Sequence, residues 1–384
     1  MTNRPRRGPL THVRVLDLSR MYPGAFCTSL LADLGADVVK VEAPGIGDGI
    51  RAMTPDPFKA GHVALNRGKR SISLDLKVPG AADVLRRLVA WTDVLVESHR
   101  PGALEQMGLG YDDLVGANPG LIWCSLTGFG GDGPQAQVPG HDLTYTGYAG
   151  VLGLLVDVGE TPPVPQMTLS LQSGALLGLV GILSAVAQRA VTGHGARIDA
   201  SLVEAASWTI AEDIARAANA PTPGWPALAS RAVYRCADGR HVTVASSEPR
   251  TWAALCAALD VADLAGHRIG TDEAAAITRL AAVFATEPAA VWLVDPGLAG
   301  GVGPVNAPED LLCDPQFVAR DAITTIDGTD TRILANPIRV RGIDGRSSTA
   351  TAPPPEIGEH TQPVLAEAGF TPREIADLCD ARIV

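Results

Sequence analysis

The feature that most constrains the fold is a regular alternation of strand and helix patterns over the first 130 residues. Strands are expected at 13–18, 37–42, 71–76, 93–97 and 121–126, and helices at 22–34 and 81–90. This alternation predicts an α/β fold, a parallel sheet covered by helices on both faces. Ligands of such sheets bind at the carboxyl ends of the strands. The loops after residues 18, 42, 97 and 126 are therefore the expected location of a site.

The composition changes after about residue 215, which predicts a second domain. A proline-rich segment at 221–226 reads as a linker, and a hairpin with Asp238-Gly239 at its turn is expected after it. We expect a large domain from residues 1–215, completed by 325–384, and a smaller α+β domain inserted at 220–320.

Charge and composition exclude several classes of function. The net charge is −11, so the 384-residue chain has no general attraction to nucleic acid or anionic lipid, and neither is expected as a partner. The six cysteines form no CxxC pair, and no metal site is predicted. No apolar run follows the first ten residues, which favours a cytoplasmic location. The apolar stretch 174–187 reads as a buried helix rather than a membrane span.

Two basic turns stand out in this acidic chain. The first is Asn66–Arg70, with three cations just before an expected strand, and the second is Ser98–Gly102, just after one. A solvated turn is the ordinary interpretation of such a charge run. The functional interpretation is a site for a ligand with several phosphates, since guanidinium and ammonium groups bind phosphate strongly.

An ordered series of motifs resembles the family III CoA-transferases (CaiB/BaiF), a family that includes α-methylacyl-CoA racemases. The matching stretches include RVLDLSR, LLADLGADVVKVEAPGIGD, NRGKRSISLDLK, MGLGYDDL, NPGLIWCSLTGFGGDGP and GHDLTYTGYAG. The resemblance runs from about residue 10 to 384. It implies a large Rossmann-like domain and a smaller one, an interlocked homodimer, and a CoA thioester as substrate without a permanently bound cofactor. It also implies a final segment that returns to the large domain.

The resemblance also implies positions for the ligand. The residues expected to hold CoA are Arg67, Lys69, Arg70 and Arg100, with Val41, Ala43 and Pro44 flanking the adenine.

Three stretches resemble the racemases more than the transferases. Gly140-His141-Asp142 matches a motif whose histidine is the base, and Glu248 matches a glutamate that orients that histidine. The stretch 169–182 aligns with the start of a helix that carries the family aspartate, but Ser170 stands at that position here. Because a serine hydroxyl is a poor acid or base, we expect solvent deuterium to enter Cα faster than configuration inverts.

Three functions follow from these residues. The first is proton abstraction and exchange at Cα of a 2-methylacyl-CoA, as in a racemase. The second is CoA transfer between carboxylic acids, which needs a carboxylate nucleophile. The third is a non-catalytic paralogue that binds acyl-CoA. The site residues also have structural interpretations: His141 as a structural histidine, and Asp142, Ser170 and Glu248 as helix caps.

Overall fold

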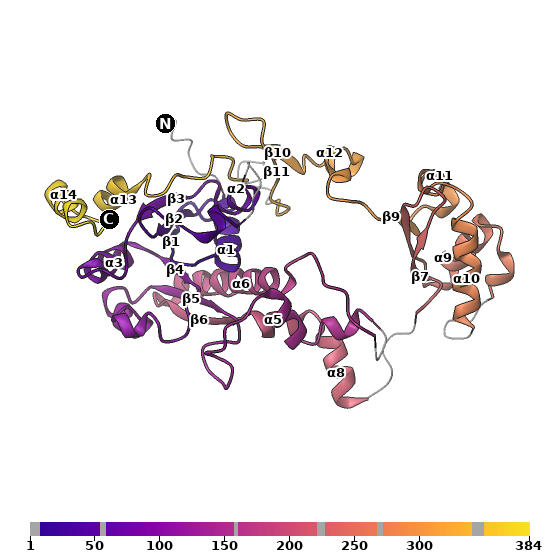
Figure 1. The fold of residues 1–384 in the computed structure, drawn as a ribbon, viewed down its shortest axis with the longest axis horizontal. Helices are drawn as coiled ribbons and strands as arrows, with labels where there is room; N and C mark the ends of the chain where they lie inside the picture. Colours follow the sequence, from indigo (N-terminus) through magenta and orange to yellow (C-terminus); the bar gives the residue numbers. More distant parts are fainter. Residues whose placement is uncertain (1–7, 54–58, 157–159, 221–226, 267–271, 340–348) are drawn as a thin grey trace. The chain divides into compact units, whose positions relative to one another are not determined.

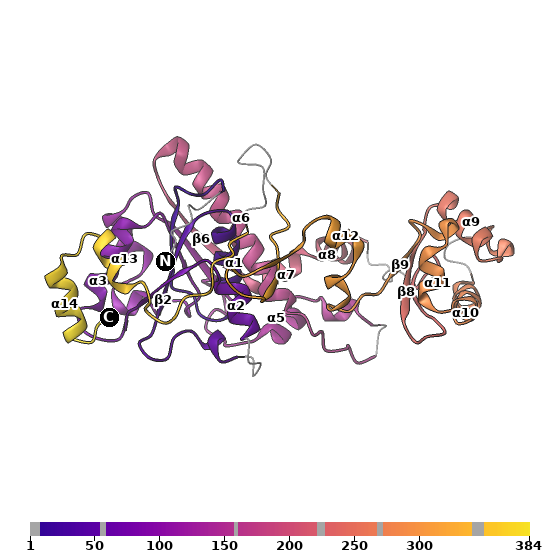
Figure 2. The same cartoon turned by 90° about the horizontal axis from the view of Figure 1, so that it is seen from above.

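The computed structural model describes residues 8–53, 59–156, 160–220, 227–266, 272–339 and 349–384. The expected linker at 221–226 lies outside these residues. The chain forms two compact units, Met1–Ile214 with Asp321–Val384 and Ala215–Arg320, and each is described by itself (Figures 1 and 2). The borders expected from the sequence lie within a few residues of these divisions.

A parallel sheet forms the centre of the first unit. Its strands are β1 (Arg14–Asp17), β2 (Asp37–Glu42), β3 (Arg70–Ser73), β4 (Val94–Glu97), β5 (Ile122–Thr127) and β6 (Ala196–Ser201). Their order is β3-β2-β1-β4-β5-β6, and neighbouring strands are parallel throughout. In doubly wound sheets of this order, ligands bind at the carboxyl ends of β1 and β4, where the winding changes direction.

Helices cover both faces of this sheet, as the sequence predicts. In chain order they are α1 (Tyr22–Asp33), α2 (Ala60–Asn66), α3 (Ala81–Trp91), α4 (Tyr111–Leu114), α5 (Asp142–Tyr148), α6 (Leu169–Thr192), α7 (Leu202–Trp208), α13 (Thr361–Glu367) and α14 (Pro372–Asp380), with α8 (Ala211–Asn219) at the border between the units. Val15 of β1 belongs to a core cluster that includes residues of α1 and α6, whereas its neighbour Leu16 belongs to a second cluster that includes residues of α3, α13 and α14. Burial on both faces explains why the central strands β4 and β5 are largely apolar.

The final segment of the chain returns to this unit. His360 N–H donates to the Ser71 carbonyl at 2.8 Å, and Asp75 N–H donates to the Ile383 carbonyl at 3.0 Å. Helices α13 and α14 lie beside α3 (Figure 1), and Leu365 of α13 is fully buried. This return confirms what the resemblance implies. The same segment also carries a short hairpin, β10 (Ile323–Thr325) with β11 (Arg332–Leu334).

Helix α6 is the one helix in the described residues that is long and apolar enough to cross a bilayer, with a mean hydropathy of 1.8. One of its faces packs against the sheet, where a Cβ on Gly178 would lie 2.8 Å from Leu126 Cδ2 and one on Gly181 would lie 3.0 Å from Ile198 Cγ2. The glycines therefore make room for the side chains of the neighbouring strands. The prediction of a buried helix holds for this face only. Apolar residues exposed on α6 include Leu176, Leu177 and Val180.

The second unit is a small α+β structure. It contains β7 (Arg231–Arg235), β8 (His241–Ala245), β9 (Val302–Pro304), α9 (Pro249–Ala258), α10 (Glu273–Phe284), α11 (Ala289–Val294) and α12 (Pro315–Ala319). Strands β7 and β8 form the predicted antiparallel hairpin, with Gly239 at a φ of +80° in its turn. Tyr234 stacks on Phe284 in the core, with 5.0 Å between ring centroids.

Candidate active site

Hydrogen bonds join the loops at the carboxyl ends of β1 and β4. Arg20 N–H, after β1, donates to Ser98 Oγ, after β4, at 2.9 Å, and Ser98 Oγ donates back to the Arg20 carbonyl at 3.2 Å. Met21 N–H donates to Asp48 Oδ1 of the loop after β2 at 3.0 Å. Three of the four loops expected to border a ligand, those after β1, β2 and β4, are thus held together by hydrogen bonds.

A buried ionic network lies beneath these loops. Asp17 accepts hydrogen bonds from Ser19 Oγ at 2.5 Å and Thr28 Oγ1 at 2.6 Å, and its Oδ2 lies 3.7 Å from Lys40 Nζ and 3.1 Å from Lys69 Nζ. Burial alone would raise the pKa of Asp17, but the two ammonium groups hold it well below its usual range. Burial lowers the pKa of Lys69 to about 8, although Asp17 opposes this shift. The network fixes the path of the chain from β1 into α1.

The three cations of the turn at 66–70 have partners within the protein. Arg67 pairs with Asp33 at 2.8 Å, and the side chain of Arg67 is only 7% exposed. Lys69 is fully buried in the network just described. Neither is the free cation that a phosphate site would need.

Arg70 lies at the other end of the sheet from the loops described above. It pairs with Asp37, the first residue of β2, at 2.7 Å, and with Glu367 of α13 at 2.8 Å. A residue that opens a parallel strand lies at the amino edge, whereas ligands bind at the carboxyl edge. The sequence suggests that the cations at 67–70 are free to bind phosphate, and the structure corrects this, because each of them forms an ion pair within the protein. That these residues contact CoA stays a prediction, and their ion pairs disfavour it.

Arg100 differs from those three cations. It follows β4 at the carboxyl edge, is exposed, and its guanidinium makes no ion pair or hydrogen bond within the described residues. Ala43 and Pro44, after β2, are exposed, and Val41 is half-buried. The structure thus leaves Arg100 accessible to an anionic group, while its contact with CoA stays a prediction.

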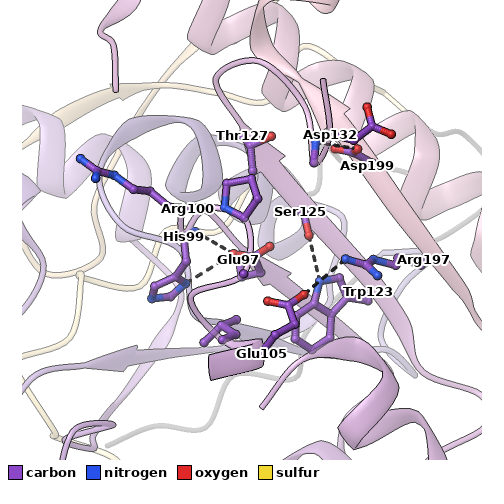
Figure 3. Close-up of a pocket in the computed structure, with 14 residues that line it drawn as sticks. Glu97, His99, Arg100, Glu105, Trp123, Ser125, Thr127, Asp132, Arg197 and Asp199 are labelled. Atoms are coloured by element: carbon purple, nitrogen blue, oxygen red, sulfur yellow. Dashed lines mark hydrogen bonds and ion pairs between the residues drawn. The ribbon is translucent and has the colours of Figure 1, made fainter. Parts of the chain in front are cut away.

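A pocket of about 320 Å³ opens beside Arg100 at the ends of β4, β5 and β6 (Figure 3). Glu97 is buried on one side, where its Oε2 accepts the His99 N–H at 2.7 Å. Thr127 Oγ1 is buried and without a hydrogen-bond partner in the part of the chain described. Asp199 of β6 accepts the Gly131 N–H at 2.8 Å. Sequence reasoning missed Glu97, Thr127 and Asp199 as site residues, although Glu97 ends a predicted strand and Thr127 directly follows another.

The Gly-His-Asp segment lies against the start of helix α6. Asp142 is the first residue of α5, and Ser170, fully buried, is the second residue of α6. Asp142 Oδ1 accepts hydrogen bonds from Ser170 Oγ at 2.5 Å, Ser170 N–H at 3.0 Å and Leu171 N–H at 3.2 Å. Asp142 therefore caps α6 from 28 residues away.

This arrangement corrects the interpretation of Ser170 as a helix cap. Helix α6 starts at Leu169, so the N-cap position belongs to Thr168, whose side chain makes no capping hydrogen bond. Ser170 instead donates its hydroxyl hydrogen to Asp142.

His141 immediately precedes this pair. Its backbone is extended, with φ −130° and ψ 170°, and it occupies the N-cap position of α5. The imidazole is exposed and has no hydrogen-bond partner within the described residues. It is therefore accessible to a substrate.

Tyr145 fixes the path of this segment. The Tyr145 N–H donates to the His141 carbonyl at 3.1 Å, and the ring packs edge-to-face on Phe129 at 5.3 Å. A Cβ on Gly128 or Gly140 would lie 2.5 or 2.6 Å from Tyr145. Burial raises the pKa of the Tyr145 hydroxyl, and a hydrogen bond with the Gly140 backbone opposes the shift. Both glycines are needed for the ring to fit.

Glu248 belongs to the second unit. It is exposed at the N-cap position of α9, and its Oε2 accepts the Thr251 hydroxyl at 3.0 Å. Glu248 occupies the N-cap position, but its side chain makes no hydrogen bond to the backbone of α9, so it does not act as a side-chain cap. Its role in orienting His141 stays a prediction.

The matching family model covers residues 10–361 and is that of CoA-transferase family III. The chain belongs to this family. Human alpha-methylacyl-CoA racemase is 33% identical, over 98% of this chain and 97% of the racemase. A succinyl-CoA:mesaconate CoA-transferase from Haloarcula hispanica is also 33% identical, over 94% of this chain and 97% of the transferase. Overall identity therefore does not separate the two reactions within family III.

The fold agrees with this membership. A crystal structure of a CaiB/BaiF family protein from Brucella suis matches with a TM-score of 0.81 at 30% identity, over 94% of this chain and 100% of that one. The family and the α/β fold class predicted from the sequence are thereby confirmed.

Proposed function

We propose that this protein abstracts and returns the proton at Cα of a 2-methylacyl-CoA thioester, with His141 as the base. The observation that carries the proposal is the accessible imidazole of His141, which has no partner in the part of the chain that the structure describes and stands beside the Asp142–Ser170 pair. The similarity to alpha-methylacyl-CoA racemase supports it.

The chemistry follows from these groups. The thioester carbonyl acidifies the α-proton, and the neutral imidazole of His141 accepts it, which leaves an enolate. Return of a proton from water or from the imidazolium regenerates the thioester. A positioned general base of this kind contributes about 10²–10⁴-fold to the rate. Within the proposal, Glu248 orients the imidazole, as the motif resemblance implies.

In the same proposal, CoA binds at the carboxyl edge of the sheet. Arg100 supplies the cation for a phosphate, because its guanidinium is exposed and unpaired in the described structure. Val41, Ala43 and Pro44, at the end of β2 and just after it, flank the adenine. Arg67 and Lys69 support the loops from below through their ion pairs. CoA enters as part of the substrate.

The test measures deuterium at Cα by mass spectrometry after incubation with several 2-methylacyl-CoAs in deuterated water. We expect the wild-type protein to incorporate one deuterium and His141→Ala to lose this activity. His194→Ala removes another exposed histidine and serves as the matched control, with wild-type exchange expected. If no 2-methylacyl-CoA exchanges its α-proton, the proposal is wrong.

A second candidate function is CoA transfer between carboxylic acids. The observation that favours it is Asp142, since a transferase needs a carboxylate that attacks the thioester. A labelled free acid incubated with an acyl-CoA would become labelled acyl-CoA under this alternative. Under the racemase proposal the label stays in the free acid. Neither exchange nor transfer would favour a non-catalytic acyl-CoA-binding protein.

We further propose that the protein works as a homodimer, as its family resemblance implies. The apolar residues exposed on α6, with Leu176 47% and Val180 56% exposed, support a protein-covered surface there. Light scattering at micromolar concentration should give twice the 39.8 kDa chain mass. A monomeric mass would contradict this.

A further inference from the structure

We infer that Asp142 supplies the acid–base carboxylate on the second face of the substrate, in place of the family aspartate that Ser170 replaces. The inference rests on the proposed proton transfer at Cα, and it names the group that makes inversion possible. It revises the expectation, drawn from the sequence, that exchange outpaces inversion.

The position of the carboxylate is the first argument. Ser170 Oγ and Asp142 Oδ1 are 2.5 Å apart, so the carboxylate lies one hydrogen bond from the side chain at the family aspartate position. Asp142 reaches this place from α5 because its side chain turns toward the start of α6. A carboxylate is therefore present at this location although the residue at 170 is a serine.

The pattern of hydrogen bonds is the second argument. Oδ1 accepts all three hydrogen bonds from Ser170 and Leu171, whereas Oδ2 accepts none within the described residues. One oxygen thus anchors the group and the other stays available for a proton. Asp142 is half-buried, so its carboxylate is partly accessible.

The proton balance is complete with these two residues. Neutral His141 takes the α-proton from one face and becomes an imidazolium, leaving the enolate. Protonated Asp142 gives its proton to the opposite face of Cα and becomes a carboxylate, so the product has inverted configuration. In the reverse direction Asp142 is the base and the imidazolium is the acid. Proton exchange with water restores the starting forms after each turnover.

The experiment separates exchange from inversion. Optically pure 2-methylacyl-CoA is incubated in deuterated water, and deuterium uptake and configuration are measured together by mass spectrometry and chiral chromatography. We expect the wild-type protein to invert at a rate comparable to exchange. Asp142→Asn keeps an oxygen that accepts the three hydrogen bonds but loses the acid, so the ratio of inversion to exchange should fall by about 10²-fold or more. Exchange by His141 should persist.

Two further variants serve as controls. Asp112→Asn removes an exposed aspartate of α4 and should leave the ratio unchanged. Asp142→Asn combined with Ser170→Asp returns a carboxylate to the family position and should recover inversion, which a purely structural Asp142 would not predict. If Asp142→Asn does not fold, Asp142→Ser, which keeps an oxygen for the start of α6 but has no carboxyl group, is measured instead, with the same fall in ratio expected.

The outcomes are distinct from those of the proposed function. An unchanged ratio in folded Asp142→Asn would overturn the inference, as would loss of exchange together with inversion, because Asp142 would then not be confined to one face. Wild-type exchange without inversion would also overturn it while leaving the proposed function in place. Absence of both from the wild type would overturn the proposed function and this inference with it.

Discussion

Substitution of Arg70 and Arg100 separates a structural cation from a ligand-binding one. Arg70→Met removes a guanidinium that is 20% exposed and pairs with Asp37 and Glu367. Hydrogen bonds to charged groups contribute roughly 1.5–3 kcal/mol, and an ion pair with an exposed partner contributes about 1 kcal/mol or less. The Asp37 pair should dominate, because its carboxylate is 9% exposed, whereas that of Glu367 is 47% exposed.

We therefore expect Arg70→Met to lower the free energy of unfolding by about 2–3 kcal/mol. In a large domain this corresponds to a fall in Tm of roughly 4–8 °C. Its affinity for CoA should stay within about twofold of wild type, since Arg70 lies at the amino edge of the sheet.

Arg100→Ala should show the opposite pattern. The guanidinium makes no ion pair in the described structure, so the Tm should hardly change. Loss of one charge-assisted phosphate contact should weaken CoA binding by about tenfold or more.

Isothermal titration with CoA and thermal unfolding of both variants provide the measurement. Weakened binding in Arg70→Met, with an unchanged Tm, would show that the turn at 66–70 binds the ligand as the sequence suggests. Unchanged binding in Arg100→Ala would remove Arg100 from the proposed site.

Two further predictions follow from the first unit. Burial lowers the pKa of His62 to about 4, and its Nδ1 accepts a hydrogen bond from Asn66 Nδ2 at 3.1 Å. As the pH falls, the imidazole therefore becomes protonated in the unfolded chain before it does in the folded one. The free energy of unfolding should fall between pH 6.5 and pH 4, by up to about 3 kcal/mol. Denaturant titrations at several pH values should show a smaller loss in His62→Gln. Gly140→Ala places a Cβ 2.6 Å from Tyr145, so it should destabilise the protein by roughly 1–3 kcal/mol and slow α-proton exchange. Gly116→Ala, whose Cβ meets nothing within 4 Å, is the control, and equal Tm values for the two would contradict the clash.

The sheet could be predicted wherever a strand is buried on both faces. Strand β2 occupies the predicted residues 37–42, because all its residues except the half-buried Val41 are buried. Strand β6 was missed because it lies at the edge of the sheet and alternates polar residues, with Arg197 and Asp199 directed to the pocket. An edge strand with one polar face gives a weaker sequence signal than a buried one.

The candidate site could be predicted only as a set of residues, because its contacts are long-range. The Gly-His-Asp motif points to His141, but the capping of α6 by Asp142 depends on a contact across 28 residues. Arg70 has partners 33 and 297 residues away, which no local pattern reveals. One signal was available: a basic turn that precedes a parallel strand lies at the amino edge, away from the ligand.

The pair formed by Asp142 and Ser170 also changes what a return to the family residue would do. Ser170→Asp alone places a second carboxylate at hydrogen-bond distance from Asp142, in a position that is fully buried. Two carboxylates this close cannot both ionise without strong repulsion, so one must bind a proton or turn away from the start of α6. We expect the single variant to lose about 1–3 kcal/mol of stability at neutral pH. Adding Asp142→Asn supplies an amide that can donate to the new carboxylate, so the double variant should recover most of the loss. A single variant as stable as wild type at neutral pH would show that the two side chains separate freely, and that the hydrogen bond between them does not hold α5 against α6.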